Sequence, residues 1–187
     1  MMIPLQFQTD PKSIWDLDVP IVRSEGLISC FITNTIFEPS VYNELVYTLL
    51  AAKDSDVITL HINTPGGEID SAVMIRDAIL LSKAKVIGKL TGTVASAGTI
   101  ITLACDEIVV SKNLSFMIHN YSTGLVGKGH EIKQQQAFME KSMVKAFSDF
   151  YLGFLTAAEI ESVIEGKDLW MAEDEVQTRW NDFKEFR

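Results

Sequence analysis

The sequence lacks the features that mark secreted and membrane-spanning chains. Cysteine occurs only twice, at Cys30 and Cys105, which is too few for a disulfide scaffold or a thiolate metal cluster. No apolar run approaches the roughly 20 residues that cross a bilayer, and residues 1–10 contain no basic region followed by an apolar stretch. We therefore expect a cytoplasmic protein with reduced, buried thiols and no membrane partner.

Positive charge is also scarce. The chain has 16 Lys and Arg against 25 Asp and Glu, a net charge of −9. Because nucleic-acid affinity depends mainly on cationic contacts with phosphates, nucleic acid is not an expected partner. No repeat, low-complexity segment or linker divides the 187 residues, of which 47% are apolar. This composition predicts one domain with a sizeable core.

The apolar pattern of the first two thirds alternates between strands and helices. Strands are predicted over 27–33, 57–62, 85–90, 107–110 and 115–119. Helices are predicted from 38–40 to about 53, over 69–81 and over 98–105, with a tight loop of small residues at 92–95. This order indicates an α/β fold with parallel crossovers.

The last third changes character. Three glycines fall in residues 121–130, and a long amphipathic helix is predicted from there to about 154, with a broad apolar face. That face packs either in the core or against a second subunit, and the pattern leaves both open. A capping box of Thr156 and Glu159 begins a further helix that ends near Gly166, and a last short helix is predicted over 172–179.

Three histidines are the only side chains that act as a base near neutral pH without a large pKa shift. His119 ends a predicted strand and so projects from the carboxyl edge of the sheet, where α/β proteins usually place their sites. His61 lies within a strand and His130 in the glycine-rich segment. A single histidine is more often structural, so His119 is a candidate base only if a nucleophile lies beside it.

Ser96 is the candidate nucleophile. It follows a predicted strand within Gly92–Gly98 and stands where a helix begins, so backbone amides and the helix dipole would stabilise an oxyanion there. The spacing differs from Gly-x-Ser-x-Gly because Val94 stands in place of the first glycine. A serine at a helix start is by itself more often an N-cap.

Two further segments have the composition of a site. Asn63-Thr64-Pro65-Gly66-Gly67 exposes bare backbone after a strand, which suits oxyanion or peptide binding, although a plain turn is equally compatible. Asp168 precedes an apolar tripeptide and is expected to be partly buried against a histidine, which it would orient. Other acids compete for that role on pattern alone, namely Asp54, Asp56, Asp77, Asp106, Asp149 and Asp174.

Together these segments resemble the ClpP family, the proteolytic component of chaperone-driven protein degradation. Asn63–Gly67 is similar to the family's Asn-Ser-Pro-Gly-Gly, Ala95–Gly98 to Ala-Ser-Met-Gly, and Met117–His119 to Met-Ile-His. Asp168, with Met171-Ala172-Glu173 after it, falls where the family has its catalytic Asp. Each motif is weak alone, but four in this order are specific.

The resemblance implies a role for each matching residue. Ser96 would be the nucleophile, His119 the general base and Asp168 the residue that orients it, while the amides of Gly67 and Ala97 would form the oxyanion hole. His61 would be non-catalytic. The residues that the resemblance implies for binding an extended substrate are Gly66, Gly124, Leu125, Val126 and Gly127. No metal site and no cofactor is implied.

The implied fold is the ClpP/crotonase type, of repeated β-β-α units with a protruding handle made of a glycine-rich strand and a long helix. One domain would span 1–187, with an N-terminal arm and short helix over 1–18 and the handle over about 121–154. The implied assembly is a homo-oligomer, two heptameric rings stacked as a tetradecamer. Its partners would be unfolded protein or peptide substrates and an ATP-driven unfoldase.

The resemblance predicts a serine endopeptidase that acts inside an oligomeric chamber. Two alternatives remain open. The chain would instead be a latent or non-catalytic ring subunit if its triad is not aligned, or a crotonase-type acyl-CoA enzyme, which also uses paired backbone amides. Thioester chemistry without peptide cleavage would favour the second alternative.

Overall fold

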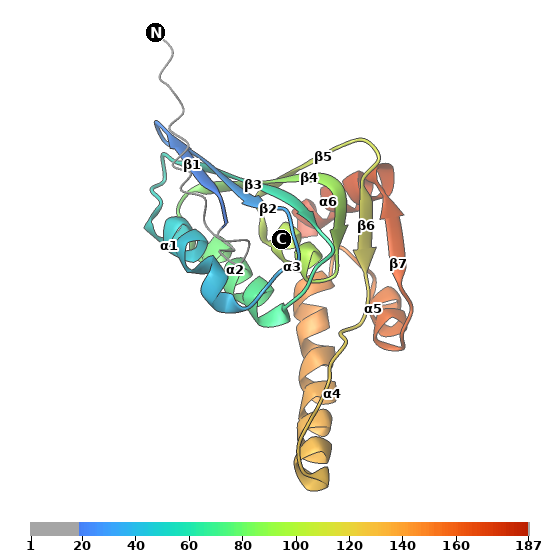
Figure 1. Ribbon diagram of the computed structural model, residues 1–187. Coiled ribbons are helices and arrows are strands. Elements are labelled where there is room, and N and C mark those ends of the chain that lie inside the picture. Colours follow the sequence, from blue (N-terminus) through green and yellow to red (C-terminus); the bar gives the residue numbers. More distant parts are fainter. Residues whose placement is uncertain (1–18, 187) are drawn as a thin grey trace.

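The computed structural model describes residues 19–186. Its centre is a seven-stranded sheet, and helices α1, α2 and α3 cover one face of it (Figure 1). The predicted N-terminal arm at residues 1–18 lies outside the described residues. The α/β class predicted from the alternating pattern is confirmed.

The strands and helices alternate along the chain as the apolar pattern predicts. The strands are β1 Ile21–Ser24, β2 Leu27–Ile32, β3 Val57–Thr64, β4 Lys85–Ala95, β5 Glu107–Val110, β6 Ser115–Ile118 and β7 Leu169–Ala172. The helices are the 3-10 turn η1 Pro39–Tyr42, α1 Asn43–Ala51, α2 Ile69–Leu81, α3 Ala97–Ala104, α4 Gly129–Tyr151, α5 Ala157–Ile164 and α6 Glu173–Phe186.

The strand order places three carboxyl ends at one edge of the sheet. The order is β1-β2-β3-β4-β6-β7, with β5 also paired to β4. Strands β2 to β6 pair in parallel, while β1 and β7 run antiparallel at the two ends. The residues that follow β3, β4 and β6, and the residue that precedes β7, therefore share one edge.

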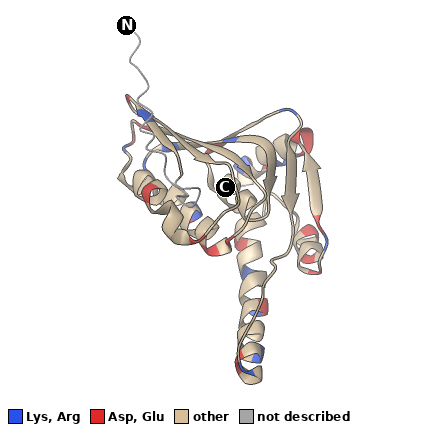
Figure 2. Cartoon of the chain, in the orientation of Figure 1, with Lys and Arg blue, Asp and Glu red and all other residues tan. Residues whose placement is uncertain are grey.

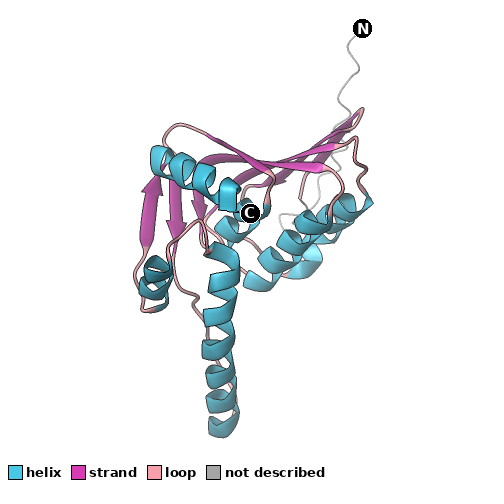
Figure 3. Cartoon of the chain, turned by 180° about the vertical axis from the view of Figure 1, so that it is seen from behind, coloured by secondary structure: helices cyan, strands magenta, loops and turns pink. Residues whose placement is uncertain are grey.

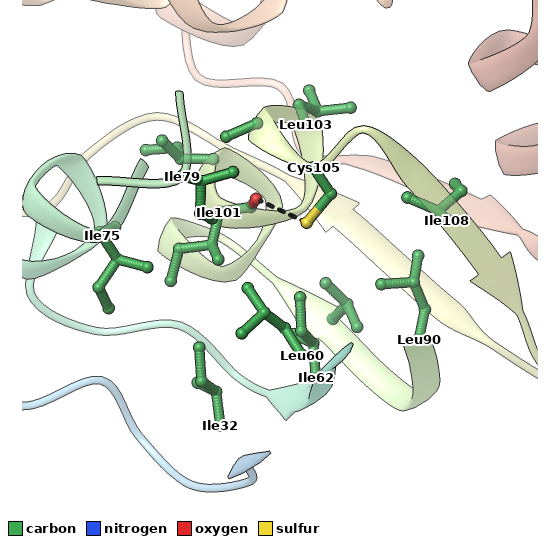
Figure 4. Close-up of a cluster of buried hydrophobic side chains, with 14 of the residues drawn as sticks. Ile32, Leu60, Ile62, Ile75, Ile79, Leu90, Ile101, Leu103, Cys105 and Ile108 are labelled. Atoms are coloured by element: carbon green, nitrogen blue, oxygen red, sulfur yellow. Dashed lines mark hydrogen bonds between the residues drawn. The ribbon is translucent and has the colours of Figure 1, made fainter. Parts of the chain in front are cut away.

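The core lies between the sheet and the helices on its covered face. Alternate residues of β3 point inward, and Ile58, Leu60 and Ile62 are fully buried there. Side chains from α2 and α3 pack on them, as the close-up in Figure 4 shows for Ile75 and Ile101. At about 25 cal/mol per Å² of apolar surface, this burial is the main stabilising contribution.

Strand β4 differs from the prediction of a strand at 85–90 followed by a loop at 92–95. It continues to Ala95, and Gly92 has a φ of 64° within it. Residues 87–90 pair with β5, whereas 93–95 pair with β6. The left-handed backbone at Gly92 is where β4 changes partner, so the small residues belong to a bent strand rather than a loop.

The C-terminal part also differs from the prediction. A strand, β7, occupies 169–172, and α6 runs on to Phe186 instead of ending at 179. Val176, Trp180 and Phe183 of α6 are buried, so the helix is held by its apolar side. The capping box of Thr156 and Glu159 is present, and Gly166 after α5 has a φ of 108°, as predicted.

Helix α4 protrudes from the body of the molecule, and the segment 120–128 runs beside it (Figures 1 and 3). We call α4 and this segment the handle. Of its predicted apolar face only the last turns are buried, at Phe147, while Phe138 is 71% exposed. Positively and negatively charged residues are interspersed along α4 (Figure 2). Of the two alternatives that the pattern left open, packing in the core therefore holds only for the last turns of the helix in the single chain.

The glycine-rich part of the handle differs from the strand that the resemblance implies. Within the described chain, residues 119–128 belong to no strand. A strand needs a ladder partner, and no described neighbour offers this segment an edge. The same described range contains no helix both long enough and apolar enough to span a bilayer.

Candidate active site

The carboxyl edge of the sheet brings the predicted site residues together. The Thr64–Gly67 loop leaves β3, Ser96 follows β4, and His119 follows β6. Asp168 immediately precedes β7, whose residue Leu169 pairs with Ile118 in the antiparallel ladder. Four segments far apart in the sequence thus meet because parallel strands end at the same edge.

Ser96 and His119 are hydrogen-bonded. The distance from Nε2 of His119 to Oγ of Ser96 is 2.8 Å, and both residues are partly buried. This is the contact that a serine nucleophile and its general base require. The lone structural histidine and the simple N-cap, the alternatives left open by the sequence, do not account for it.

Ser96 stands on a sharp backbone turn. Its φ is 53° and its ψ is −126°, a left-handed φ that is unusual for a residue with a side chain. Its amide donates to the carbonyl of Met117 in β6 at 2.8 Å, and its side chain makes no capping bond to α3. A conformation of this kind costs about 1–3 kcal/mol and persists only where the surroundings enforce it. Here it directs the hydroxyl to His119.

The loop after β3 lies between the strand and Ile36. Gly66 has a φ of 97° and Gly67 one of 146°. The Ile36 amide donates to the Gly66 carbonyl and the Ile36 carbonyl accepts from the Glu68 amide, each at 2.8 Å. This pairing leaves the Gly67 amide outside the bridge. Thr64 steadies the start of the loop, because its hydroxyl accepts from the Gly66 amide at 3.1 Å.

Ala97 begins helix α3, so its amide is among the first donors of the helix, which have no carbonyl partner within it. Gly66 approaches this amide closely: a β-carbon at position 66 would lie 3.1 Å from the Ala97 nitrogen. The Gly66–Gly67 loop and the start of α3 therefore stand side by side. Two backbone segments arranged in this way can supply amides to one oxyanion.

Asp168 is exposed, which contradicts the expectation of partial burial. Strand β7 has four residues and forms the rim of the sheet, and nothing described covers the residue before it. Asp168 and His119 each lie one residue beyond the last pair of the register, Ile118 and Leu169, but in the described chain no hydrogen bond joins their side chains. Among the competing acids, Asp106 accepts from the Val86 amide at 2.7 Å and serves the sheet instead.

The other two histidines lie elsewhere. His61 stacks on Phe31, with ring centroids 4.4 Å apart and planes 9° from parallel. Partial burial, and then Lys89 in the neighbouring strand, lower the pKa of His61. His130 lies in the exposed first turn of α4, where its Nε2 is 4.0 Å from Oε1 of Glu131. Neither contacts Ser96, so His119 is the base candidate of the three.

Three residues near the site gave no usable sequence signal. Asn120 donates to the Ile164 carbonyl at 2.8 Å and so ties the end of β6 to α5. Thr99 and Tyr151 form a buried hydrogen bond at 2.9 Å between α3 and α4. They are 52 residues apart, and local periodicity carries no information about a contact of that separation.

The geometry agrees with comparisons to known proteins. The family model described as Clp protease matches residues 27–177. The chain belongs to the Clp protease family. This Clp protease chain is 31% identical over 159 residues to the ATP-dependent Clp protease proteolytic subunit 3 of Rhizobium meliloti (strain 1021), covering 80% of this chain and 78% of that protein.

Other relatives support the same assignment at similar sequence identity. The ATP-dependent Clp protease proteolytic subunit 2 of Pseudomonas aeruginosa is 33% identical over 135 residues, which cover 69% of this chain and 66% of that protein. The subunit 3 of Rhizobium johnstonii is 38% identical over 97 residues, covering 51% and 49%. This Clp protease chain is thus a divergent member, and its family supports a ClpP-like peptidase.

Proposed function

We propose that this chain is a serine endopeptidase that hydrolyses peptide bonds of unfolded proteins. The observation that carries the proposal is the 2.8 Å contact between His119 Nε2 and Ser96 Oγ, held by a left-handed Ser96 backbone. The Clp protease family supplies the reaction class. A crotonase-type acyl-CoA enzyme would have no use for this serine–histidine pair.

In the proposed reaction His119 accepts the Ser96 proton as Oγ attacks the substrate carbonyl. The developing oxyanion is bound by the amides of Gly67 and Ala97, which the loop and the helix start hold in place before the reaction. His119 then gives the proton to the leaving amine. Water attacks the acyl-enzyme in the second half of the cycle, again with His119 as base.

Asp168 is proposed to orient His119 and to stabilise its imidazolium. The antiparallel register between β6 and β7 supports this role, since Asp168 and His119 each lie one residue beyond its last pair, Ile118 and Leu169. The carboxylate and the ring are not hydrogen-bonded in the single chain, so the proposal includes alignment of this pair on assembly. A latent ring subunit would show the same unaligned pair. The two are distinguished by activity at rising protein concentration, which increases on assembly only if the pair becomes aligned.

Assembly is proposed to occur through the handle. Phe138 and Val144 are 71% and 49% exposed on α4, and Val126 beside it is fully exposed. Apolar side chains on a protruding element are covered at low cost by another copy of the same element. The proposed assembly is a homo-oligomer of heptameric rings stacked as a tetradecamer. Gly66, Gly124, Leu125, Val126 and Gly127 are proposed to bind the extended substrate, and an ATP-driven unfoldase to deliver it.

The test measures turnover of a dye-quenched unfolded protein and of a fluorogenic peptide over a range of protein concentrations. Wild type is compared with Ser96→Ala and with Ser55→Ala, a control in the exposed turn before β3. We expect turnover to vanish in Ser96→Ala, with unchanged thermal stability, and to persist in Ser55→Ala. Full activity of Ser96→Ala would overturn the proposal, and hydrolysis of thioesters alone would favour the crotonase-type alternative.

A further inference from the structure

A chain of buried hydroxyl groups joins the nucleophile to the base of the handle helix. Oγ1 of Thr99 donates to the Ser96 carbonyl oxygen at 2.7 Å and lies 2.9 Å from the hydroxyl of Tyr151. Thr99 is fully buried and Tyr151 is 2% exposed. The contact therefore connects α3, which begins at the site, with the last residue of α4.

Each of the two hydroxyl groups has only one hydrogen to donate, and this fixes the direction of both hydrogen bonds. The Thr99 hydroxyl has one hydrogen, which it donates to the Ser96 carbonyl. The Tyr151 hydroxyl must therefore donate to Thr99 Oγ1. Burial raises the pKa of Tyr151, and the hydrogen bond with Thr99 offsets only part of this increase. The phenol therefore keeps its proton. The Tyr151 hydroxyl thus donates to the Thr99 hydroxyl, which in turn donates to the Ser96 carbonyl.

The Ser96 carbonyl belongs to the same peptide group as the Ala97 amide. A peptide unit is planar, so a bond that fixes the direction of the carbonyl also fixes the direction of the N–H. Ser96 has a strained φ of 53°, and its carbonyl accepts from both the amide and the hydroxyl of Thr99, at 2.9 and 2.7 Å. The side-chain bond is the one that Tyr151 holds in place.

We propose that Tyr151 is a positioning residue that, through Thr99, sets the orientation of the Ser96–Ala97 peptide and thereby of the oxyanion-binding Ala97 amide. This inference rests on the proposed function. Tyr151 acts on the site indirectly, because its phenol is hydrogen-bonded to Thr99. A loss of its hydroxyl therefore changes the rate of the chemical step and leaves substrate binding unchanged.

Tyr151 is itself fixed by the aromatic base of α4. Its ring centroid is 5.4 Å from that of Phe147 and 6.2 Å from that of Phe150. The guanidinium of Arg76 in α2 lies 5.3 Å from the Phe150 centroid. The position of the handle base is thus transmitted to the site by side chains that have little freedom to move.

Steady-state kinetics of four variants test the role. Tyr151→Phe removes one hydroxyl and retains the ring, Thr99→Val removes the acceptor and donor together, and Thr99→Ser restores them. Thr102→Val is the matched control, because the Thr102 hydroxyl is equally buried in α3 and bonds only to the Gly98 carbonyl of its own helix.

We expect kcat to fall about 3–10-fold in Tyr151→Phe and about 10–100-fold in Thr99→Val, with KM unchanged, since loss of a complete oxyanion donor costs about 100–1,000-fold. Thr99→Ser is expected to recover most of the activity. Thr102→Val is expected to keep wild-type kcat while losing comparable stability. A kcat loss in Thr102→Val equal to that in Tyr151→Phe would assign the effect to stability and overturn the inference.

Amide hydrogen exchange gives a readout that needs no turnover. The Thr99 amide donates to the Ser96 carbonyl at 2.9 Å, so its exchange reports how firmly this peptide group is held. We expect faster exchange at Thr99 in Tyr151→Phe than in wild type or Thr102→Val. Unchanged exchange would overturn the inference even if Ser96 proves catalytic. Failure of the proposed function is recognised separately, by turnover that survives Ser96→Ala.

Discussion

Gly66 lies directly against Ser96. A β-carbon at position 66 would lie 2.5 Å from Cβ of Ser96 and 2.8 Å from the carbonyl oxygen of Ala95, distances at which atoms overlap. The φ of 97° at Gly66 is also a conformation that residues with a side chain rarely adopt. The loop after β3 and the turn after β4 can therefore approach each other only while position 66 is glycine.

Substitution of Gly66 by Ala is predicted to displace Ser96 and to strain the loop. We expect kcat/KM to fall by about 100-fold or more, because displacements of about 1 Å have such effects. The free energy of unfolding is expected to fall by about 1–3 kcal/mol. Enzyme assays and urea unfolding measure the two effects.

Gly129→Ala is the control for this substitution. Position 129 lies in the first turn of α4, and a β-carbon there would meet no atom within 4 Å. Its activity is expected to stay at the wild-type value, and its unfolding free energy to stay the same or to rise by up to about 1 kcal/mol. Wild-type activity in Gly66→Ala would show that the close approach of the two segments does not matter for the site.

Asp168→Asn tests the third member of the proposed triad. The substitution keeps the shape of the side chain and removes the charge that is proposed to stabilise the imidazolium of His119. We expect kcat to fall by roughly three to four orders of magnitude, as loss of this charge does in a serine triad. Asp174→Asn, which removes an acid from the first turn of α6, is expected to leave kcat unchanged. Activity of Asp168→Asn within about twofold of wild type would exclude the carboxylate from the mechanism.

The pH dependence of stability is predicted to depend on Glu159. The Arg179 guanidinium donates to both oxygens of this carboxylate, at 2.7 and 3.0 Å. This contact lowers the pKa of Glu159 from 4.5 to about 2. A lowered pKa stabilises the fold above pH 4.5, and the stabilisation is lost as the pH falls from 4.5 toward 2.

Urea unfolding between pH 2 and 7 measures this contribution. Glu159→Gln keeps the capping bonds to Thr156 but is expected to lose about 1 kcal/mol near neutral pH and to show a flatter acid limb than wild type. Glu161→Gln, an exposed change in the same helix, is expected to follow wild type. Parallel curves for Glu159→Gln and wild type would contradict the assignment.

The handle is predicted to hold copies of the chain together. Phe138→Glu places a charge on the exposed apolar side of α4, and sedimentation velocity is expected to show smaller particles. Gln136→Glu adds the same charge on the opposite side of the helix and is expected to assemble normally. An unchanged sedimentation profile for Phe138→Glu would remove this surface from the interface.

Local pattern was sufficient for much of the fold. Helix α2 spans 69–81 as predicted, because its apolar residues repeat at helical spacing and Gly66-Gly67 precede it. The strand β7 was missed because its apolar run of four residues is too short to identify a strand by itself, and only Met171 in it is buried. Its existence depends on pairing with the distant β6. Strands at a rim are set by their partner more than by their own sequence.

The site was recoverable from the sequence to the extent that it uses strand ends. Ser96 and His119 were found because each follows a strand, and parallel strands bring such positions together. The exposure of Asp168 was not foreseen, since burial at a rim depends on what covers it. The Thr99–Tyr151 bond was also unforeseeable, because the handle base that supplies Tyr151 reaches α3 only through the tertiary fold.

The central claim is that Ser96 is an activated nucleophile. The direct measurement is labelling of the purified protein by a fluorophosphonate probe, located by peptide mass mapping over a range of protein concentrations. The account predicts a label on Ser96 alone, absent from Ser96→Ala, whose extent rises with concentration as the chain assembles. An assembled, folded protein that takes no label, or takes it on another serine, would contradict it.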